Sequence, residues 1–183
     1  RPQGDENLRC LNIQIAVCFT DADMQRIKSG EPEALELFGE ILRTRAETGS
    51  PYLFWVDTAN RVRPLGYEKL GLLIKASQLC NEAFGYTDEL HTFVCCLSSM
   101  NVAEWDAFEG TAAIYYATWF LDGVMQEYID KASLKEGFEN SVRFAKASRM
   151  LGLGVLGYHT LLQKKSMPFE SFQARLMNKV IFK

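Results

Sequence analysis

Two short apolar runs, residues 52–56 and 92–97, constrain the fold of this chain more than any other feature of its sequence. The first is an unbroken series of aromatic and aliphatic residues, and Ser50-Pro51 leads into it. A strand that is apolar at every position is covered on both faces, as in a parallel sheet. Residues 11–19 are a third strand candidate, because apolar side chains alternate there at Ile13, Ile15 and Val17.

Helical patterns separate these strand candidates. Thr20 is a suitable N-cap for a helix over Asp21–Lys28, and Gly49 is expected to close the helix that follows. Because strands and helices alternate along the chain, the sequence predicts an α/β architecture. The other expected segments are a helix over 33–47, mostly loop over 57–76, a long helix over 109–128 with Tyr115, Trp119 and Phe120 on a buried face, and two helices over 138–150 and 155–165 separated by a glycine-rich step.

Composition excludes several classes of protein. The chain has 183 residues, only five prolines and no glycine- or serine-rich linker, so residues 1–183 are expected to form one domain or part of one. With 20 Lys and Arg against 23 Asp and Glu, it has no basic excess with which to hold nucleic acid. The longest apolar stretch, residues 111–121, falls short of the ~20 residues of a membrane helix. A polar N-terminus without a secretory signal predicts a cytoplasmic protein.

The cysteines indicate redox chemistry more than metal binding. Cys10, Cys18, Cys80, Cys95 and Cys96 are odd in number and lack C-x-x-C spacing, and the chain has only two histidines. Neither a disulfide framework nor a zinc site fits this pattern. We therefore expect thiols that are free or redox-active, and no metal or cofactor bound by this chain.

An amide, a thiol and a carboxylate occupy every second position at Gln78, Cys80 and Glu82. An extended backbone would project all three side chains to one side. A carboxylate beside a thiol disfavours the nucleophilic thiolate, so chemistry that begins from a neutral sulfur suits this cluster better than ordinary nucleophilic catalysis.

Cys95 and Cys96 follow within the strand candidate 92–97, where their side chains should point to opposite faces. Only one of them can therefore face the cluster around Cys80. From the local pattern alone, both could equally be small buried apolar residues, which is the usual role of a cysteine in a core.

Four segments in the same order resemble the large subunit of class I ribonucleotide reductase. The radical-cysteine segment and the later cysteine strand of that family are similar to Ser77-Gln78-Leu79-Cys80-Asn81-Glu82 and to Val94-Cys95-Cys96-Leu97-Ser98-Ser99-Met100-Asn101. The other two matches are Arg45-Ala46-Glu47-Thr48-Gly49-Ser50-Pro51-Tyr52 and Arg149-Met150-Leu151-Gly152-Leu153-Gly154-Val155-Leu156-Gly157.

The resemblance implies that the chain is part of a ten-stranded α/β barrel, with Cys80 on a loop that enters its centre. In the family this cysteine becomes a thiyl radical and abstracts the 3′-hydrogen of a ribonucleotide, in deoxynucleotide synthesis. By the same matching, Glu82 is the general base, Gln78 binds the ribose hydroxyls, and Cys95 supplies reducing equivalents as half of a redox-active pair. Cys96 falls where the family commonly has another residue, so we expect it to serve packing.

The chain also departs from the family at one of the expected site residues and in length. The family usually has Asn where this chain has Gln78. Residues 1–183 correspond to a central segment of the barrel, without the N-terminal cone that sets overall activity and without the C-terminal part. The resemblance implies that the disulfide partner of Cys95 lies on an upstream barrel strand that is not among residues 1–183, and neither Cys10 nor Cys18 lies in a context similar to that of the partner. Turnover by this chain alone is not expected.

The resemblance also implies partners. They are a ribonucleoside diphosphate substrate, the remaining parts of the large subunit, a small subunit whose metal centre generates the radical, and thioredoxin or glutaredoxin as external reductant. The assembly is expected to be oligomeric and allosterically regulated. Strand edges left unpaired in a barrel fragment should make the isolated chain prone to aggregation.

Two alternatives remain open from the sequence. The chain could be a non-catalytic structural piece of a split reductase that needs other chains. It could also be a nicotinamide-dependent oxidoreductase, because Gly152-x-Gly154-x-x-Gly157 fits the dinucleotide fingerprint. That fingerprint needs a strand ahead of it, whereas residues 138–150 have a helical pattern. Close packing of a helix on a strand explains these glycines better.

Overall fold

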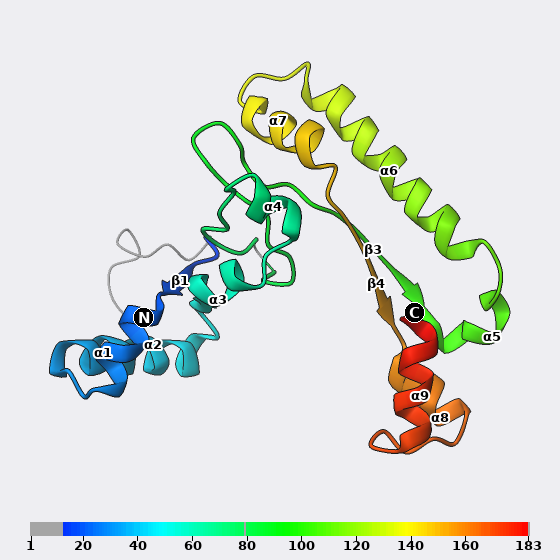
Figure 1. Cartoon of the computed structure of the whole chain (residues 1–183), viewed down its shortest axis with the longest axis horizontal. Helices are drawn as coiled ribbons and strands as arrows, with labels where there is room; N and C mark the ends of the chain where they lie inside the picture. Colours follow the sequence, from blue (N-terminus) through cyan, green and yellow to red (C-terminus); the bar gives the residue numbers. More distant parts are fainter. Residues whose placement is uncertain (1–12, 79, 183) are drawn as a thin grey trace. The chain divides into compact units, whose positions relative to one another are not determined.

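The computed structural model describes residues 13–78 and 80–182 (Figure 1). The chain divides into two compact units, Arg1–Phe93 and Val94–Lys183. Each unit combines helices with one pair of parallel strands, in agreement with the predicted α/β class.

The first unit is built around the parallel strands β1 and β2. They pair in register from Ala16 opposite Tyr52 to Phe19 opposite Trp55. Parallel strands need a crossover between them, which helices α1 and α2 supply. The elements are β1 (Ala16–Phe19), α1 (Asp21–Lys28), α2 (Pro32–Thr48), β2 (Tyr52–Trp55), α3 (Val56–Arg61) and α4 (Leu65–Lys69).

Local capping signals placed the helices of this crossover correctly. Thr20 and Asp23 form a capping box, in which the Thr20 hydroxyl accepts the Asp23 N–H while the Asp23 carboxylate accepts the Thr20 N–H. Helix α2 ends at Gly49, which adopts the left-handed conformation with φ 75°. The helix predicted over Asp21–Lys28 is confirmed at both ends.

The prediction that residues 57–76 are mostly loop is wrong, because α3 and α4 lie within this range. Both helices are too short to show an apolar period, so their sequences gave no helical signal. Both helices contribute side chains to the apolar cluster of the first unit. Its buried members are Phe54, Ala59 and Ile74, and Val56, Tyr67 and Phe84 pack against them.

The second unit contains the parallel strands β3 and β4, which run side by side in Figure 1. One apolar cluster, centred on Met125 and Ala145, joins α6 and α7, and another joins η2, α5 and α8 around Val102 and Leu161. The elements are β3 (Cys96–Asn101), η2 (Val102–Glu104), α5 (Trp105–Phe108), α6 (Ala113–Ala132), α7 (Glu139–Ser148), β4 (Leu151–Leu156), α8 (Tyr158–Lys164) and α9 (Phe172–Ile181).

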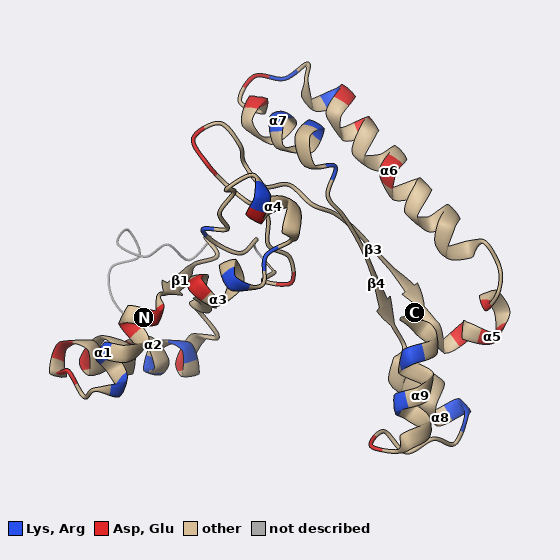
Figure 2. Cartoon of the chain, viewed as in Figure 1, with Lys and Arg blue, Asp and Glu red and all other residues tan. Residues whose placement is uncertain are grey.

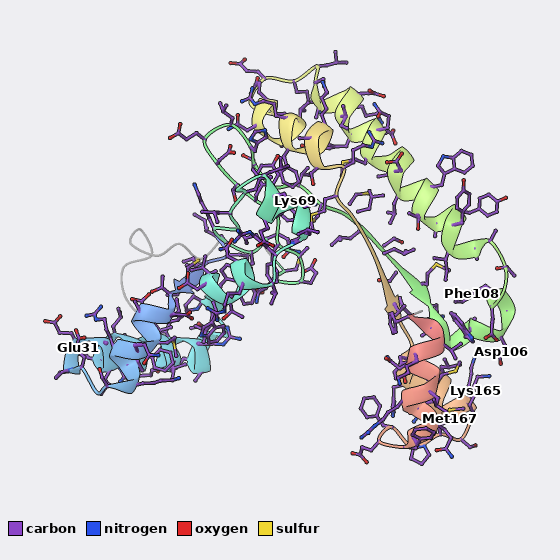
Figure 3. All side chains as sticks on the ribbon, in the orientation of Figure 1. Glu31, Lys69, Asp106, Phe108, Lys165 and Met167 are labelled. Atoms are coloured by element: carbon purple, nitrogen blue, oxygen red, sulfur yellow. The ribbon has the colours of Figure 1, made fainter. Side chains whose placement is uncertain are left out.

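Ion pairs connect the elements around the cluster of Val102 and Leu161. Lys165, which ends α8, lies 2.7 Å from the carboxylate of Asp106 in α5, and Figure 3 labels both side chains. Lys164 lies 2.6 Å from Glu104 and also donates to the carbonyl of Ala103. Both pairs are solvent-exposed in part, so they orient α8 more than they stabilise it.

Two boundaries in the second unit differ from prediction. The strand expected over 92–97 begins only at Cys96 and continues to Asn101. The helix expected over 155–165 is shorter, because residues 151–156 form strand β4. The sequence did not predict this strand because it contains Gly152 and Gly154, and glycine has low strand propensity. A Cβ on Gly152 would lie 2.3 Å from Leu97 Cδ2, the end of a flexible side chain on the paired strand β3, so a larger residue here would displace the Leu97 side chain. The neighbours of Gly152 thus lie on the paired strand, and not on a helix as predicted.

The predicted buried face of α6 is also wrong. Tyr115, Trp119 and Phe120 are 68%, 66% and 70% exposed. The buried positions lie on another face, at Leu121, Met125, Ile129 and Ala132. The first half of α6 has no charged residue before Asp122, as its tan ribbon in Figure 2 shows, and its apolar residues lie on more than one face. Periodicity cannot choose between two such faces. Across residues 13–78 and 80–182, no helix has the length and apolarity needed to cross a membrane.

Candidate functional site

The segment that carries Cys80 is a loop with both ends on one apolar cluster. Ile74, at its start, is 2% exposed and belongs to the cluster with Phe54. Phe84, at its far end, packs against the same cluster, with its ring centre 5.2 Å from that of Phe54. The described residues between them, 75–78 and 80–83, form no strand or helix, so the loop depends on these two anchors for its position.

Hydrogen bonds close the tip of the loop into a turn. The Gln78 N–H donates to the Ala83 carbonyl at 3.3 Å, and the Asn81 N–H donates to the Gln78 carbonyl at 3.1 Å. Asn81 has φ 63°, a left-handed conformation that asparagine tolerates better than most residues. The extended backbone assumed for residues 78–82 is therefore wrong, because the chain turns here.

The three predicted site residues of this loop differ in exposure. Cys80 and Glu82 are exposed, whereas Gln78 is half-buried. The Gln78 side-chain carbonyl accepts the backbone N–H of Glu82 at 3.2 Å. This bond links the amide to the backbone of the expected base. The three residues therefore lie in one turn, and not on one side of an extended strand as their alternation predicted.

The remaining predicted site residue, Cys95, lies in the second unit, directly before β3. It is half-buried. Since Cys80 belongs to the first unit, the convergence of Cys80 with Cys95 stays a prediction.

The neighbouring thiol of Cys96 points into packed structure. Cys96 contacts the cluster of Met125, Ile129 and Ala145, and its thiol donates to the Leu121 carbonyl at 3.5 Å. Burial raises the pKa of this thiol. The prediction that Cys96 serves packing is confirmed by these contacts.

Of the two other cysteines, the structure describes Cys18 alone. The Cys18 thiol donates to the Lys75 carbonyl at 3.6 Å, and burial raises its pKa. Cys10 lies outside the described residues. Within the part of the chain that the structure describes, no group of three or more His, Cys, Asp or Glu side chains could hold a metal ion.

The loop between Phe84 and Cys95 contains a histidine–carboxylate pair. His91 Nδ1 lies 2.8 Å from Asp88 Oδ1, which also accepts the backbone N–H groups of Leu90 and His91. The Leu90 N–H, together with His91, holds the pKa of the Asp88 carboxyl below its usual value. The carboxylate therefore serves to close a turn that orients His91.

The glycine series does not have the geometry of a dinucleotide site. Helix α7 precedes it, and Gly152 and Gly154 lie inside β4. Only Gly157 occupies a strand-to-helix turn, where it caps α8 with φ 78°. The dinucleotide fingerprint needs its glycines in the turn after a strand, which is not their position here.

Asn60 is a residue of this region that the sequence analysis missed. Its side chain is half-buried on α3 and makes hydrogen bonds to both backbone groups of Ile74, where the Cys80 loop begins. The sequence offered no signal for this contact, because it joins residues 14 positions apart across a range without periodicity.

Comparison with known proteins gives a consistent picture. Residues 31–183 match the family model of the ribonucleotide reductase barrel domain. The chain is 43% identical over 152 residues to the ribonucleoside-diphosphate reductase large subunit of Invertebrate iridescent virus 3, covering 82% of this chain and 24% of that protein. It is 37% identical over 198 residues to a putative large subunit of Frog virus 3, covering 100% of this chain and 35% of the relative.

A solved structure agrees with the sequence relatives. The class Id ribonucleotide reductase alpha subunit of Actinobacillus ureae superposes with a TM-score of 0.85 at 40% identity, over 93% of this chain and 33% of that one. The chain thus spans about a quarter to a third of the length of these relatives.

Proposed function

Because this chain belongs to the barrel-domain family of ribonucleotide reductase large subunits, we propose that it forms the central part of a ribonucleoside-diphosphate reductase. The observation that carries the proposal is the turn of Gln78, Cys80 and Glu82, on a loop anchored at both ends, within the segment that the family model matches. Residues 1–183 span about a quarter to a third of the length of the relatives, so the proposed catalysis also uses parts of the barrel beyond these residues.

In the proposed reaction, the Cys80 thiyl radical takes a hydrogen atom from C3′ of the substrate, giving a Cys80 thiol and a C3′ radical. Glu82 accepts the proton of the 3′-hydroxyl, as a general base within hydrogen-bond reach would. One cysteine of a pair, formed by Cys95 and a second cysteine outside these residues, gives a proton to the 2′-hydroxyl, which leaves as water. The other cysteine supplies the hydrogen atom that replaces the hydroxyl at C2′. The two sulfurs join in a disulfide and pass the remaining electron to the substrate, while Glu82 returns its proton to the 3′-oxygen. Cys80 then returns its hydrogen atom to C3′ and regains the radical.

The exposure of the two loop residues supports these roles. Cys80 and Glu82 are exposed at the tip of a loop whose ends are fixed, so both can reach a bound ribose. Cys96 is a poor candidate for the reductant, since its thiol is packed against α6. Cys95 is the better one.

Gln78 suits a role in organising the turn as well as in binding. Its side-chain carbonyl bonds the Glu82 N–H, while the amide NH₂ group of a glutamine can donate two hydrogen bonds. Those donors are the groups that we assign to the ribose hydroxyls. In this way the longer side chain of Gln78 could replace the usual Asn.

We place the remaining requirements outside this chain. A small subunit would generate the radical at its metal centre, and thioredoxin or glutaredoxin would reduce the disulfide formed by Cys95. The proposed substrate is a ribonucleoside diphosphate, and the proposed compartment is the cytoplasm.

A chimera tests the proposal. In it, residues 31–183 replace the matched segment of the class Id alpha subunit, and formation of deoxynucleoside diphosphate is measured in the presence of that protein's radical-generating partner. We expect turnover by the chimera and none by Cys80→Ala. Product formed by Cys80→Ala would contradict the assignment. A folded chimera that binds substrate without turnover would favour the non-catalytic alternative.

A further inference from the structure

We infer that Asn60 is a positioning residue that fixes the loop carrying Cys80. Its consequence for catalysis rests on the proposed function, whereas its effect on the loop does not. Asn60 lies on α3, outside the loop, and its side chain makes three hydrogen bonds, which reach Val56 and Ile74, not Cys80 or Glu82.

The Asn60 amide binds Ile74 as a neighbouring strand would. Its Nδ2 donates to the Ile74 carbonyl at 2.7 Å, and its Oδ1 accepts the Ile74 N–H at 3.0 Å. The second hydrogen of Nδ2 serves the Val56 carbonyl, at 2.9 Å, within α3 itself. Both donors of the amide are thus in use, and the bonds tie the loop to a helix that packs on the same cluster.

The hydrogen bonds from Asn60 fix the orientation of the Ile74 backbone, which apolar contact alone cannot do. Burial of the Ile74 side chain holds this residue on the cluster, but the hydrophobic effect is non-directional and does not fix the orientation of the backbone. Hydrogen bonds to both backbone groups fix that orientation. The next residue is held as well, since the Lys75 carbonyl accepts the Cys18 thiol.

The orientation of the backbone at Ile74 determines where the site residues lie. Gln78 is bonded to Ala83 and Glu82, so the tip moves as one turn. A rotation of the backbone at Ile74 would therefore displace Gln78, Cys80 and Glu82 together. For a hydrogen-atom transfer that needs close approach, such a displacement is costly.

The test uses the variants Asn60→Ala and Asn60→Asp, with Arg61→Gln as matched control. Asn60→Ala removes both bonds to Ile74, whereas Asn60→Asp keeps only the acceptor. Arg61 lies on the same helix, but its guanidinium binds Asp21 and Thr58, outside the loop.

The first readout is amide hydrogen exchange in the full 183-residue chain. We expect exchange across residues 74–83 to become roughly 10- to 100-fold faster in Asn60→Ala, because two partly buried hydrogen bonds are lost. Exchange should also become faster in Asn60→Asp, because a carboxylate oxygen would there face the carbonyls of Ile74 and Val56 without a hydrogen to donate. Amides of β1 and β2 should keep their rates, and Arg61→Gln should leave the loop unchanged. Unchanged exchange over 74–83 in Asn60→Ala would overturn the inference.

The second readout is the pair of kinetic constants in the chimera. Partial unfolding would lower the apparent kcat at constant KM, because fewer molecules are active. Displacement of the loop moves Gln78 as well as Cys80, so Asn60→Ala should lower kcat and also raise KM for the substrate. Wild-type constants in a variant with a loosened loop would overturn the catalytic part. If the parent chimera shows no turnover, the proposed function fails, and hydrogen exchange alone decides whether Asn60 fixes the loop.

Discussion

Replacement of Gly157 by alanine gives a sharp test of how β4 joins α8. Gly157 has φ 78°, and a Cβ there would lie 2.5 Å from Asn101 Oδ1 and 3.1 Å from the Ala103 N atom. Asn101 Oδ1 accepts the Ala103 N–H and caps η2. The added methyl group would therefore clash with an atom that makes this capping hydrogen bond.

The expected loss has two parts. The left-handed conformation costs a non-glycine residue about 1–2 kcal/mol. Displacement of the Asn101 side chain removes a cap worth about 1 kcal/mol. The free energy of unfolding should therefore fall by about 2–3 kcal/mol in Gly157→Ala.

Two further glycines serve as controls. Gly137 has φ 85° with no atom within 4 Å of its hypothetical Cβ, so Gly137→Ala should show only the backbone cost. Gly123 lies within α6 in open space, and Gly123→Ala should stabilise by about 0.5–1 kcal/mol.

Urea unfolding, followed by the fluorescence of buried Trp105 with Trp55 and Trp119 replaced by Phe, measures these differences. Equal losses in Gly157→Ala and Gly137→Ala would refute the contact with Asn101. A gain in stability in Gly157→Ala would refute the left-handed turn itself.

Three other predictions concern packing, charge and exposed surface. Phe144 is 0% exposed, so Phe144→Ala should lower the free energy of unfolding by about 3–5 kcal/mol in urea titrations, and a loss below 1 kcal/mol would contradict its burial. The pKa of Asp88 is lowered in the folded chain, so its contribution to stability is complete above the pKa of unfolded Asp, about 3.9, and is lost as pH falls through the lower folded value. Thermal melting should thus separate Asp88→Ala from the parent at pH 7 and not at pH 2, whereas an equal difference at both would contradict the pairing. Trp119→Ser should change stability by less than about 0.5 kcal/mol and reduce light scattering of the isolated chain, and a large loss of stability would show that Trp119 is buried.

Local signals in the sequence were sufficient for part of the fold. Thr20 is the N-cap of α1, as predicted, and the structure shows that it forms a capping box with Asp23. Gly49 follows the last residue of α2, also as predicted. Each of these features depends on residues within a few positions of one another. The sequence pattern can therefore specify them without knowledge of the tertiary structure.

Features decided by tertiary contact were not predictable in this way. Gly152 lies in β4 opposite Leu97, whose side chain lies where a Cβ would be, and only the pairing of the two strands reveals this contact. The choice between the two apolar faces of α6 depends on where α7 packs. Met125 and Ile129 face Ala145, and Trp119 does not.

The candidate site shows the same division. The order of Gln78, Cys80 and Glu82, with Cys95 beyond, identified the loop and the family from the sequence. The turn at Asn81 was missed, because a pattern of residue types assumes a backbone conformation that it does not determine. Asn60 was missed because its role arises from a contact between distant positions.

The most direct measurement of the central claim is a competitive isotope effect on product formation. The chimera is supplied with ribonucleoside diphosphate carrying hydrogen or deuterium at C3′, and the ratio of the two products is followed. Abstraction of this hydrogen by Cys80 predicts that the deuterated substrate is consumed more slowly and that Cys80→Ala forms no product. Equal consumption of both substrates, or product from Cys80→Ala, would contradict the assignment of Cys80 as the radical site.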